Sequence, residues 1–281
     1  MAEIALPLIG HGEAETAFLK ALDGGRLHHA WIIEGPSGIG KARFVIRLAS
    51  MLLGAKGIPG DPLSVPGDDP VIQKIIASAH PDLKHVTREM NEKGALKQDI
   101  SVDQIRALNQ FFSLKPALGG WRIGILDSID EMNTNGLNAV LKTLEEPPAR
   151  AILFLISHGT APVLPTIRSR CQTLRLGRLS EEETLGVLRM RDENTAEQIA
   201  ALVKGRPGRA EALTGPKVLA AANAAHALLK SLSRLSDAHL ATAIQAAGED
   251  EAAFADPTQT VMEVPHALVP AIRKLLAKHQ A

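Results

Sequence analysis

"GPSGIGKARF", residues 35–44, decides the fold of this 281-residue chain. Its two outer glycines and Lys41 satisfy all but the last position of the phosphate-binding pattern G-x-x-x-x-G-K-[ST]. A short apolar strand is predicted at 30–34, directly before the loop, and a helix with a broad apolar face at 41–53, directly after it. A strand, a glycine loop and a helix in this order are the context that a P-loop requires. The loop positions predicted to surround a nucleotide are Gly35, Pro36, Ser37, Gly38, Ile39, Gly40, Lys41 and Ala42.

The chemistry of nucleotide hydrolysis fails at two positions. Ala42 stands where a hydroxyl would ligate the magnesium ion between the phosphates. Asp127 ends an apolar strand, but Ser128 follows it where a water-activating acid is expected. Asp130 and Glu131 are expected to begin the next helix, whose N-terminus favours acidic side chains. We therefore expect an abandoned hydrolysis site, at which weak or metal-free nucleotide binding remains open.

Strands and helices alternate over the first two thirds of the sequence. A second strand is predicted in 80–87, a helix at 101–113 with Ser101 as its N-cap, and a third strand at 122–126. A helix over 130–146 should end at the two prolines that follow it. "AILFLIS", 151–157, is an almost uninterrupted apolar run, as a strand buried on both faces should be. This alternation predicts an α/β fold with a parallel sheet covered on both sides.

The predicted domains are a P-loop nucleotide-binding-like domain at 1–178, a small helical lid at 179–215 and a helical, collar-like segment at 216–281. Ser180 and Glu183 form a capping box where the helical part begins. The glycine- and proline-rich segment 57–69 is expected to be an exposed loop.

The composition excludes several classes of protein. Thirty-one basic residues balance thirty-one acidic ones, so no overall charge points to DNA or to an anionic membrane. The single cysteine excludes an internal disulfide and a cysteine-rich zinc cluster. The N-terminus does not read as a signal peptide, and no apolar run is long enough to span a bilayer, so a cytoplasmic protein is expected. A DNA-binding module would need a concentrated basic face. The candidate basic cluster for it, which is more simply explained as a solvated hairpin, is Lys84, His85, Arg88, Lys93 and Lys97.

Three segments carry a resemblance to a known family. "NAVLKTLEEPP" and "TIRSRC", together with "LHHAWIIEGPSGIGKA" upstream, resemble delta-prime subunits of bacterial DNA polymerase III clamp loaders, from about Ile9 to Leu213. The resemblance implies the AAA+ fold, with a nucleotide-binding domain, a helical lid and an oligomerising collar. It also implies a hetero-pentamer with gamma/tau motor subunits and a delta subunit, which loads the sliding clamp onto primed DNA with ATP. In that family the delta-prime subunit is stationary and a poor ATPase.

The resemblance also implies roles for single residues. Arg170, in Ser-Arg-Cys, would be an arginine finger that reaches ATP held by the neighbouring motor subunit, since a guanidinium can fork onto phosphate oxygens. Ser157 matches the sensor 1 position and Arg209 the sensor 2 position. Arg168 and Arg175 are interpreted as surface charges.

Two features depart from the family. Residues 54–82 hold no cysteine, so the zinc module that relatives usually carry there should be metal-free or missing, and no metal is expected. The part after Gly215 is shorter than a full collar.

The residues at positions 42 and 128 distinguish two possible functions. The favoured function is a non-hydrolysing stator that needs no cofactor of its own, with weak ATP or ADP binding left open. The alternative is an active AAA+ motor subunit with ATPase activity, which Ser or Thr at position 42 and Glu at 128 would have favoured. Cys171 is expected to be a packed small side chain.

Overall fold

A five-stranded parallel sheet organises the first part of the chain in the computed structural model, which describes residues 8–91 and 93–213. The strand order is β2-β3-β4-β1-β5. The strands are β1 (Ala30–Glu34), β2 (Leu83–Val86), β3 (Arg122–Asp127), β4 (Ala151–Ser157) and β5 (Gln172–Arg175). The helices of this part are α1 (Gly12–Asp23), α2 (Lys41–Leu52), α3 (Pro70–Ile76), α4 (Val102–Ser113), α5 (Thr134–Glu145) and α6 (Pro165–Arg168), with a 3-10 turn, η2 (Ile129–Glu131). The predicted α/β class is confirmed.

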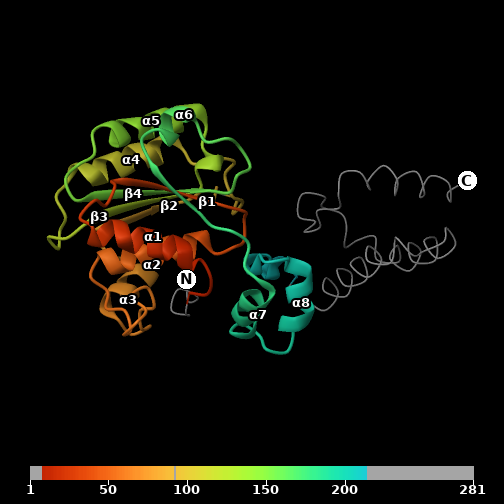
Figure 1. Cartoon of the computed structure of the whole chain (residues 1–281). Helices are drawn as coiled ribbons and strands as arrows, with labels where there is room; N and C mark the ends of the chain where they lie inside the picture. Colours follow the sequence, from red (N-terminus) through yellow and green to blue (C-terminus); the bar gives the residue numbers. More distant parts are fainter. Residues whose placement is uncertain (1–7, 92, 214–281) are drawn as a thin grey trace, which may run out of the picture. The chain divides into compact units, whose positions relative to one another are not determined.

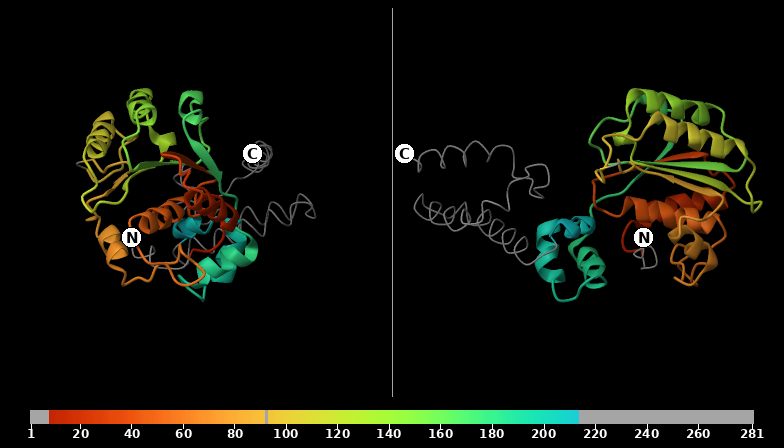
Figure 2. Two further views of the ribbon diagram at one scale, coloured as in Figure 1. Left: turned by 60° about the vertical axis from the view of Figure 1, so that its left-hand side comes forward. Right: turned by 180° about the vertical axis from the view of Figure 1, so that it is seen from behind.

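Helices cover both faces of this sheet. Figure 1 shows α4, α5 and α6 on one face and α1, α2 and α3 on the other, and the views of Figure 2 show the same three layers. The central strand β4 is buried along its whole length, which explains its unbroken apolar sequence. Ser101 caps α4 in a capping box with Gln104, as the sequence predicts.

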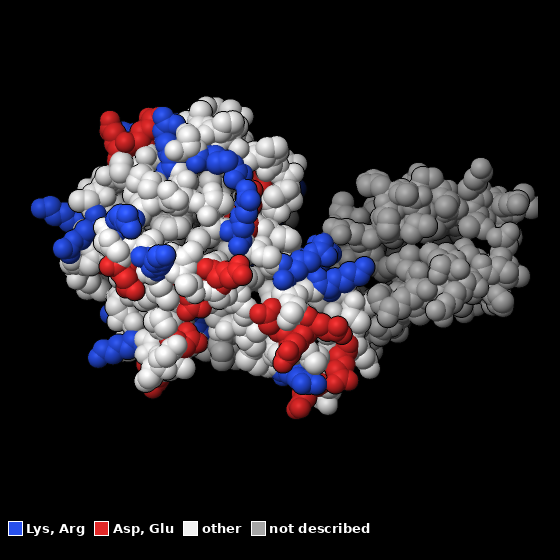
Figure 3. Space-filling view, in the orientation of Figure 1, with Lys and Arg blue, Asp and Glu red and all other residues white. Residues whose placement is uncertain are grey.

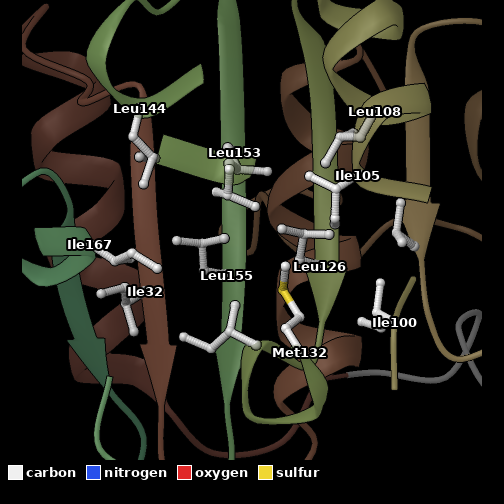
Figure 4. Packing of buried hydrophobic residues seen from close by; sticks show 14 of the residues in the cluster. Ile32, Ile100, Ile105, Leu108, Leu126, Met132, Leu144, Leu153, Leu155 and Ile167 are labelled. Atoms are coloured by element: carbon white, nitrogen blue, oxygen red, sulfur yellow. The ribbon is translucent and has the colours of Figure 1, made fainter. Parts of the chain in front are cut away.

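One hydrophobic core, the α4–α6 core, lies between the sheet and the layer of α4, α5 and α6. Figure 4 shows Leu153 and Leu155 of β4 and Leu126 of β3 on the sheet side of this core, with Leu108 of α4 and Leu144 of α5 packed against them. All five are almost fully buried. Close packing of these buried side chains fixes the ends of the strands, where the candidate site lies.

The helix predicted over 130–146 begins later than expected. Residues 129–131 form the separate turn η2, and α5 starts at Thr134. Asn133 provides the N-cap, because its side chain accepts a hydrogen bond from the backbone N–H of Gly136. The start at 130 is therefore wrong, and Asp130 is available for a different contact.

The loop predicted as exposed at 57–69 is partly buried. Leu63 and Val65 are almost inaccessible, and the guanidinium of Arg47 on α2 donates to both of their carbonyl oxygens, at 3.1 and 3.3 Å. Arg47 is itself fully buried. The polar backbone of this segment can therefore enter the interior, and the prediction of an exposed loop is wrong for residues 63–65.

The chain divides into two compact units between Glu183 and Thr184. The division falls within α7 (Glu181–Arg189), which α8 (Ala196–Val203) and a 3-10 segment, η3 (Pro207–Leu213), follow. The second unit has a small core of its own, built from Leu188, Ala196, Ile199, Val203, Ala210 and Leu213. The predicted collar-like segment, 216–281, lies outside the described residues. Among the described helices, none has both the length and the apolar character needed to cross a membrane.

Candidate functional site, a degenerate phosphate loop and an arginine turn

The carboxyl ends of three neighbouring strands bring the predicted site residues together. Glu34 at the end of β1 is paired with Ser157 at the end of β4, and Asp127 at the end of β3 is paired with Ile156. The phosphate loop leaves β1 at this edge. In open parallel sheets, the crevice at the carboxyl ends of the strands is where ligands bind.

Glycines are required at both ends of the phosphate loop. The N–H of Gly35 donates to the carbonyl of Ser157 at 3.3 Å, and a Cβ on residue 35 would lie 2.2 Å from the carbonyl oxygen of Leu176. Gly40, at the N-cap of α2, has a φ of 96°, which side chains other than hydrogen rarely allow. The loop thus keeps the backbone of a phosphate cradle.

Lys41 is directed into its own loop. Its ammonium donates to the carbonyl oxygens of Gly35 and Pro36, both at 2.6 Å, and the residue is only 3% exposed. Burial lowers the pKa of this ammonium to about 8, against the opposing effect of Asp127 and Asp130. The ammonium that would bind phosphate in a P-loop is therefore hydrogen-bonded to carbonyls of the loop's own backbone.

The acidic side of the site is also rearranged. Ser128 is buried, and its hydroxyl oxygen has no hydrogen-bond partner among the described residues. The Asp130 carboxylate accepts from the hydroxyl of Ser157 at 3.2 Å and from the N–H of His158 at 2.6 Å. Asp130 thus fastens the end of β4, a role that the sequence did not indicate.

Asp127 lies between two histidines instead of beside a second acid. Nε2 of His85, on β2, is 3.8 Å from one carboxylate oxygen, and Nε2 of His158 is 3.9 Å from the other. Burial, reinforced by Lys41, lowers the pKa of His158. The imidazoles beside Asp127 add no second carboxylate for a metal or for activating water.

His11 contacts the loop from the N-terminal side and was not singled out in the sequence. Its Nε2 donates to the carbonyl of Ile39 at 2.9 Å, and its ring meets Phe44 of α2 edge-on, with the ring centroids 6.1 Å apart. Burial lowers the pKa of His11. In the loop itself Ser37 is exposed, Ile39 is buried and Ala42 is half-buried.

Arg170 lies in the turn that follows α6, with 38% of its side chain exposed. Its Nη1 donates to the carbonyl oxygen of Thr166 at 2.9 Å and to the hydroxyl of Ser169 at 3.3 Å. Its Nη2 is 3.1 Å from a carboxylate oxygen of Glu145, the last residue of α5. The guanidinium is thus held at the surface by two elements.

The neighbouring arginines share a different carboxylate. Arg168 donates twice to Glu34, at 3.0 and 3.4 Å, and Arg175 lies 3.5 Å from the same group. The hydrogen bond from Arg168 is the main cause that lowers the pKa of Glu34. Both arginines are therefore paired within the chain, and the turn that carries Arg170 is tied to the residue that precedes the phosphate loop.

The structure brings together Gly35–Ala42, Asp127 and Ser157, but not all predicted site residues. Arg209 is in η3 of the second unit, and Arg170 belongs to the turn after α6. Glu34 and Glu145 were missed in the sequence, because a carboxylate that restrains a distant arginine leaves no local pattern. The only sequence signal for Glu145 was its place in "LEEPP".

Two members of the candidate basic cluster are neutralised by ion pairs. Arg88 is paired with Glu131 at 2.9 Å and Lys97 with Glu89 at 2.8 Å. Met90 and Leu96 form an antiparallel bridge, in agreement with the predicted hairpin. On the face shown in Figure 3, acidic and basic side chains are interspersed over the first unit. This arrangement does not favour a DNA-binding face there.

Cys171 packs at the edge of the α4–α6 core and is partly buried. Burial raises the pKa of its thiol to about 12. A thiol in this state is a weak nucleophile, as expected for a packing residue.

Sequence comparisons connect this geometry to a family. The family model for "DNA polymerase III, delta subunit" matches residues 10–180. A DNA polymerase III subunit delta' from Pseudomonas aeruginosa is 36% identical over 209 residues, which are 73% of this chain and 61% of that protein. A subunit tau from Escherichia coli is 30% identical over 177 residues, 63% of this chain and 26% of that protein.

Solved structures align with the chain at lower identity. A gamma subunit-related protein from Thermotoga maritima aligns over 83% of this chain and 77% of its own, with 18% identity and a TM-score of 0.41.

The chain spans about three fifths of the Pseudomonas relative and about a quarter of the Escherichia coli one. The family model nevertheless covers more than half of the chain. The chain therefore belongs to the DNA polymerase III delta-subunit family, and its resemblance to delta-prime clamp-loader subunits is confirmed.

Proposed function

We propose that this chain is a non-hydrolysing clamp-loader subunit that supplies Arg170 to ATP bound by a neighbouring motor subunit. The observation that carries the proposal is the contrast between the two arginines of one turn. The two side chains are equally exposed, at 39% and 38%, but Arg168 gives both terminal nitrogens to the Glu34 carboxylate. Arg170 instead donates through Nη1 to its own turn and is ion-paired through Nη2 with Glu145, and its Nε has no hydrogen-bond partner among the described residues. An arginine supplied across an interface stabilises the charge that develops on the transferred phosphoryl group.

The chain's own phosphate loop supports the non-hydrolysing half of the proposal. Lys41 donates to two carbonyls of its own loop, and Ala42 offers no oxygen to a magnesium ion. Ser128 stands in place of the expected water-activating acid, and Asp130 is engaged with the end of β4. Each of these losses removes a part that phosphoryl transfer requires.

The proposed partners follow from the family. They are gamma/tau motor subunits and a delta subunit in a hetero-pentamer in the cytoplasm, acting on the sliding clamp and primed DNA. A subunit delta' and subunits tau and gamma are among the relatives that the chain matches. Such a subunit needs no nucleotide of its own to serve its neighbour, although weak binding of ATP or ADP stays compatible with the loop backbone.

The test is the ATPase rate of a complex reconstituted from this chain and its clamp-loader partners. Arg170→Ala should leave assembly intact and reduce hydrolysis at the site it serves by roughly 10³-fold or more. Arg175→Ala, a loss of the same charge on β5, should leave the rate unchanged. An unchanged rate with Arg170→Ala, at equal complex mass, would remove Arg170 from this role.

A further inference from the structure

Three contacts from two elements orient the guanidinium of Arg170. Thr166 and Ser169 hold Nη1 from the turn that carries the arginine, and Glu145 holds Nη2 from the end of α5. A guanidinium has five N–H donors; the hydrogen bonds to Thr166 and Ser169 use the two on Nη1, and the ion pair with Glu145 faces Nη2. The Nε–H and one Nη2–H remain for a ligand, and such a pair can fork onto two phosphate oxygens.

Glu145 lies on a firmly anchored support. Its neighbour Leu144 is buried in the α4–α6 core, and the carbonyl of Leu144 accepts a hydrogen bond from His29 at 3.1 Å. Pro147 and Pro148 end the helix directly afterwards. The backbone that carries Glu145 is therefore anchored, whereas Arg170 is in a short surface turn.

Stability of the fold does not explain a carboxylate at this position. An acidic side chain at the C-terminus of a helix faces the negative end of the helix dipole. Glu145 is 51% exposed and Arg170 is 38% exposed, and ion pairs at such exposure add little to the free energy of unfolding. What the pair does provide is a fixed direction for a long side chain that otherwise samples many rotamers.

We propose that Glu145 is a positioning residue for Arg170, which holds the guanidinium in the orientation that a phosphate group on an adjacent protomer requires. This inference rests on the proposed function, because it concerns the arginine that acts in the neighbour's site. Glu145 touches neither nucleotide nor the reacting atoms. It reduces the conformational freedom that Arg170 must lose when it engages the phosphate.

Glu145→Ala, Glu145→Gln and Glu146→Ala, compared in the reconstituted complex, test the role in catalysis. Glu146 is the adjacent exposed acid, so its variant controls for loss of charge at the same helix end. Glu145→Ala should lower kcat about ten-fold and leave the KM for ATP within about two-fold, because orientation acts on the transition state. Glu145→Gln keeps an acceptor oxygen and should recover most of kcat, and Glu146→Ala should match the wild type.

A double variant identifies the residue through which Glu145 acts. Glu145→Ala added to Arg170→Ala should cause no further loss of kcat, because the group that it positions is gone. A wild-type kcat for Glu145→Ala in an assay where Arg170→Ala is impaired would overturn the inference. An equal loss from Glu145→Ala with and without Arg170 would overturn it as well.

Modification by phenylglyoxal separates this inference from the proposed function. The isolated chain is treated with the reagent, and the rate at Arg170 is followed by peptide mass spectrometry. Glu145→Ala should accelerate modification several-fold, while Glu146→Ala should not. If Arg170→Ala leaves the ATPase unchanged, the finger role fails, yet the phenylglyoxal rates still report whether Glu145 holds Arg170. Equal rates at Arg170 in all three proteins would overturn the inference by themselves.

Discussion

Replacing Lys41 by methionine should remove a pH dependence of stability that is unusual for a lysine. The pKa of Lys41 falls from its ordinary value of 10.5 to about 8 in the folded protein, because its ammonium is buried. Between these values the unfolded chain still binds the proton and the folded protein has released it. The unfolded state then holds more protons, so the free energy of unfolding rises with pH.

The size of the effect follows from the two pKa values. A difference of one pKa unit corresponds to about 1.4 kcal/mol. The interval from about 8 to 10.5 therefore corresponds to about 3 kcal/mol of added stability at its upper end. This contribution is absent below pH 8, where Lys41 is charged in both states.

Urea unfolding between about pH 7 and pH 10.5 measures this contribution. Fluorescence of Trp31, which is buried on β1, reports on the unit that contains the loop. Wild type should gain stability over the upper part of this range relative to Lys41→Met. Lys20→Met, at an exposed position in the last turn of α1, is the matched control and should keep the wild-type slope. If the free energy of unfolding changed with pH in the same way in wild type and Lys41→Met, the ammonium of Lys41 would not be buried in the loop as described.

Three further outcomes are expected. Arg47→Met should lower the free energy of unfolding by about 2–4 kcal/mol in urea denaturation, because two buried carbonyls of the 57–69 segment lose a charged donor; a loss below about 0.5 kcal/mol would contradict this. Cys171 should react with a disulfide reagent at about pH 8 roughly 1,000-fold more slowly than free cysteine, since its thiol pKa is about 12, and rapid labelling of the native protein would count against its burial. The pKa of Glu34 lies below its ordinary 4.5 through the bond from Arg168, so its contribution to stability is present above pH 4.5 and is lost as the pH falls through the lower, folded value. Glu34→Gln should reduce the loss of unfolding free energy at acid pH. An unchanged loss would show that Glu34 does not cause it.

Local sequence patterns predicted the elements whose stability is local or whose burial is complete. The apolar runs of β1 and β4 and the capping box of Ser101 are where the sequence placed them. These signals work because an apolar strand between two helical layers has one stable environment, and because a cap involves residues only a few positions apart.

Predictions failed where a distant side chain changed the local preference. Segment 57–69 has the composition of an exposed loop, but Arg47 satisfies its carbonyls and allows Leu63 and Val65 to be buried. Asp130 reads as a helix start, but it binds the end of β4 instead. Neither contact leaves a trace in a short sequence window, because each depends on the folded sheet.

The candidate site shows the same division. The glycine loop and Asp127 could be located from the sequence pattern and Ser157 from the resemblance, and all of them lie at the edge where the carboxyl ends of the parallel strands meet. The inward direction of Lys41 could not be predicted, because the motif fixes the position of the lysine and not its rotamer. The restraint on Arg170 by Glu145 also depends on the packing of α5 against α6.

The most direct test of the account compares two variants of this chain in one reconstituted complex. Single-turnover ATP hydrolysis is measured with Arg170→Ala and with Lys41→Met, at equal complex mass. The account predicts that Arg170→Ala depresses hydrolysis at the adjoining motor site. Lys41→Met should leave the hydrolysis rate unchanged, since the lysine contacts only this chain's own non-hydrolysing phosphate loop. Loss of hydrolysis with Lys41→Met and wild-type hydrolysis with Arg170→Ala would contradict it.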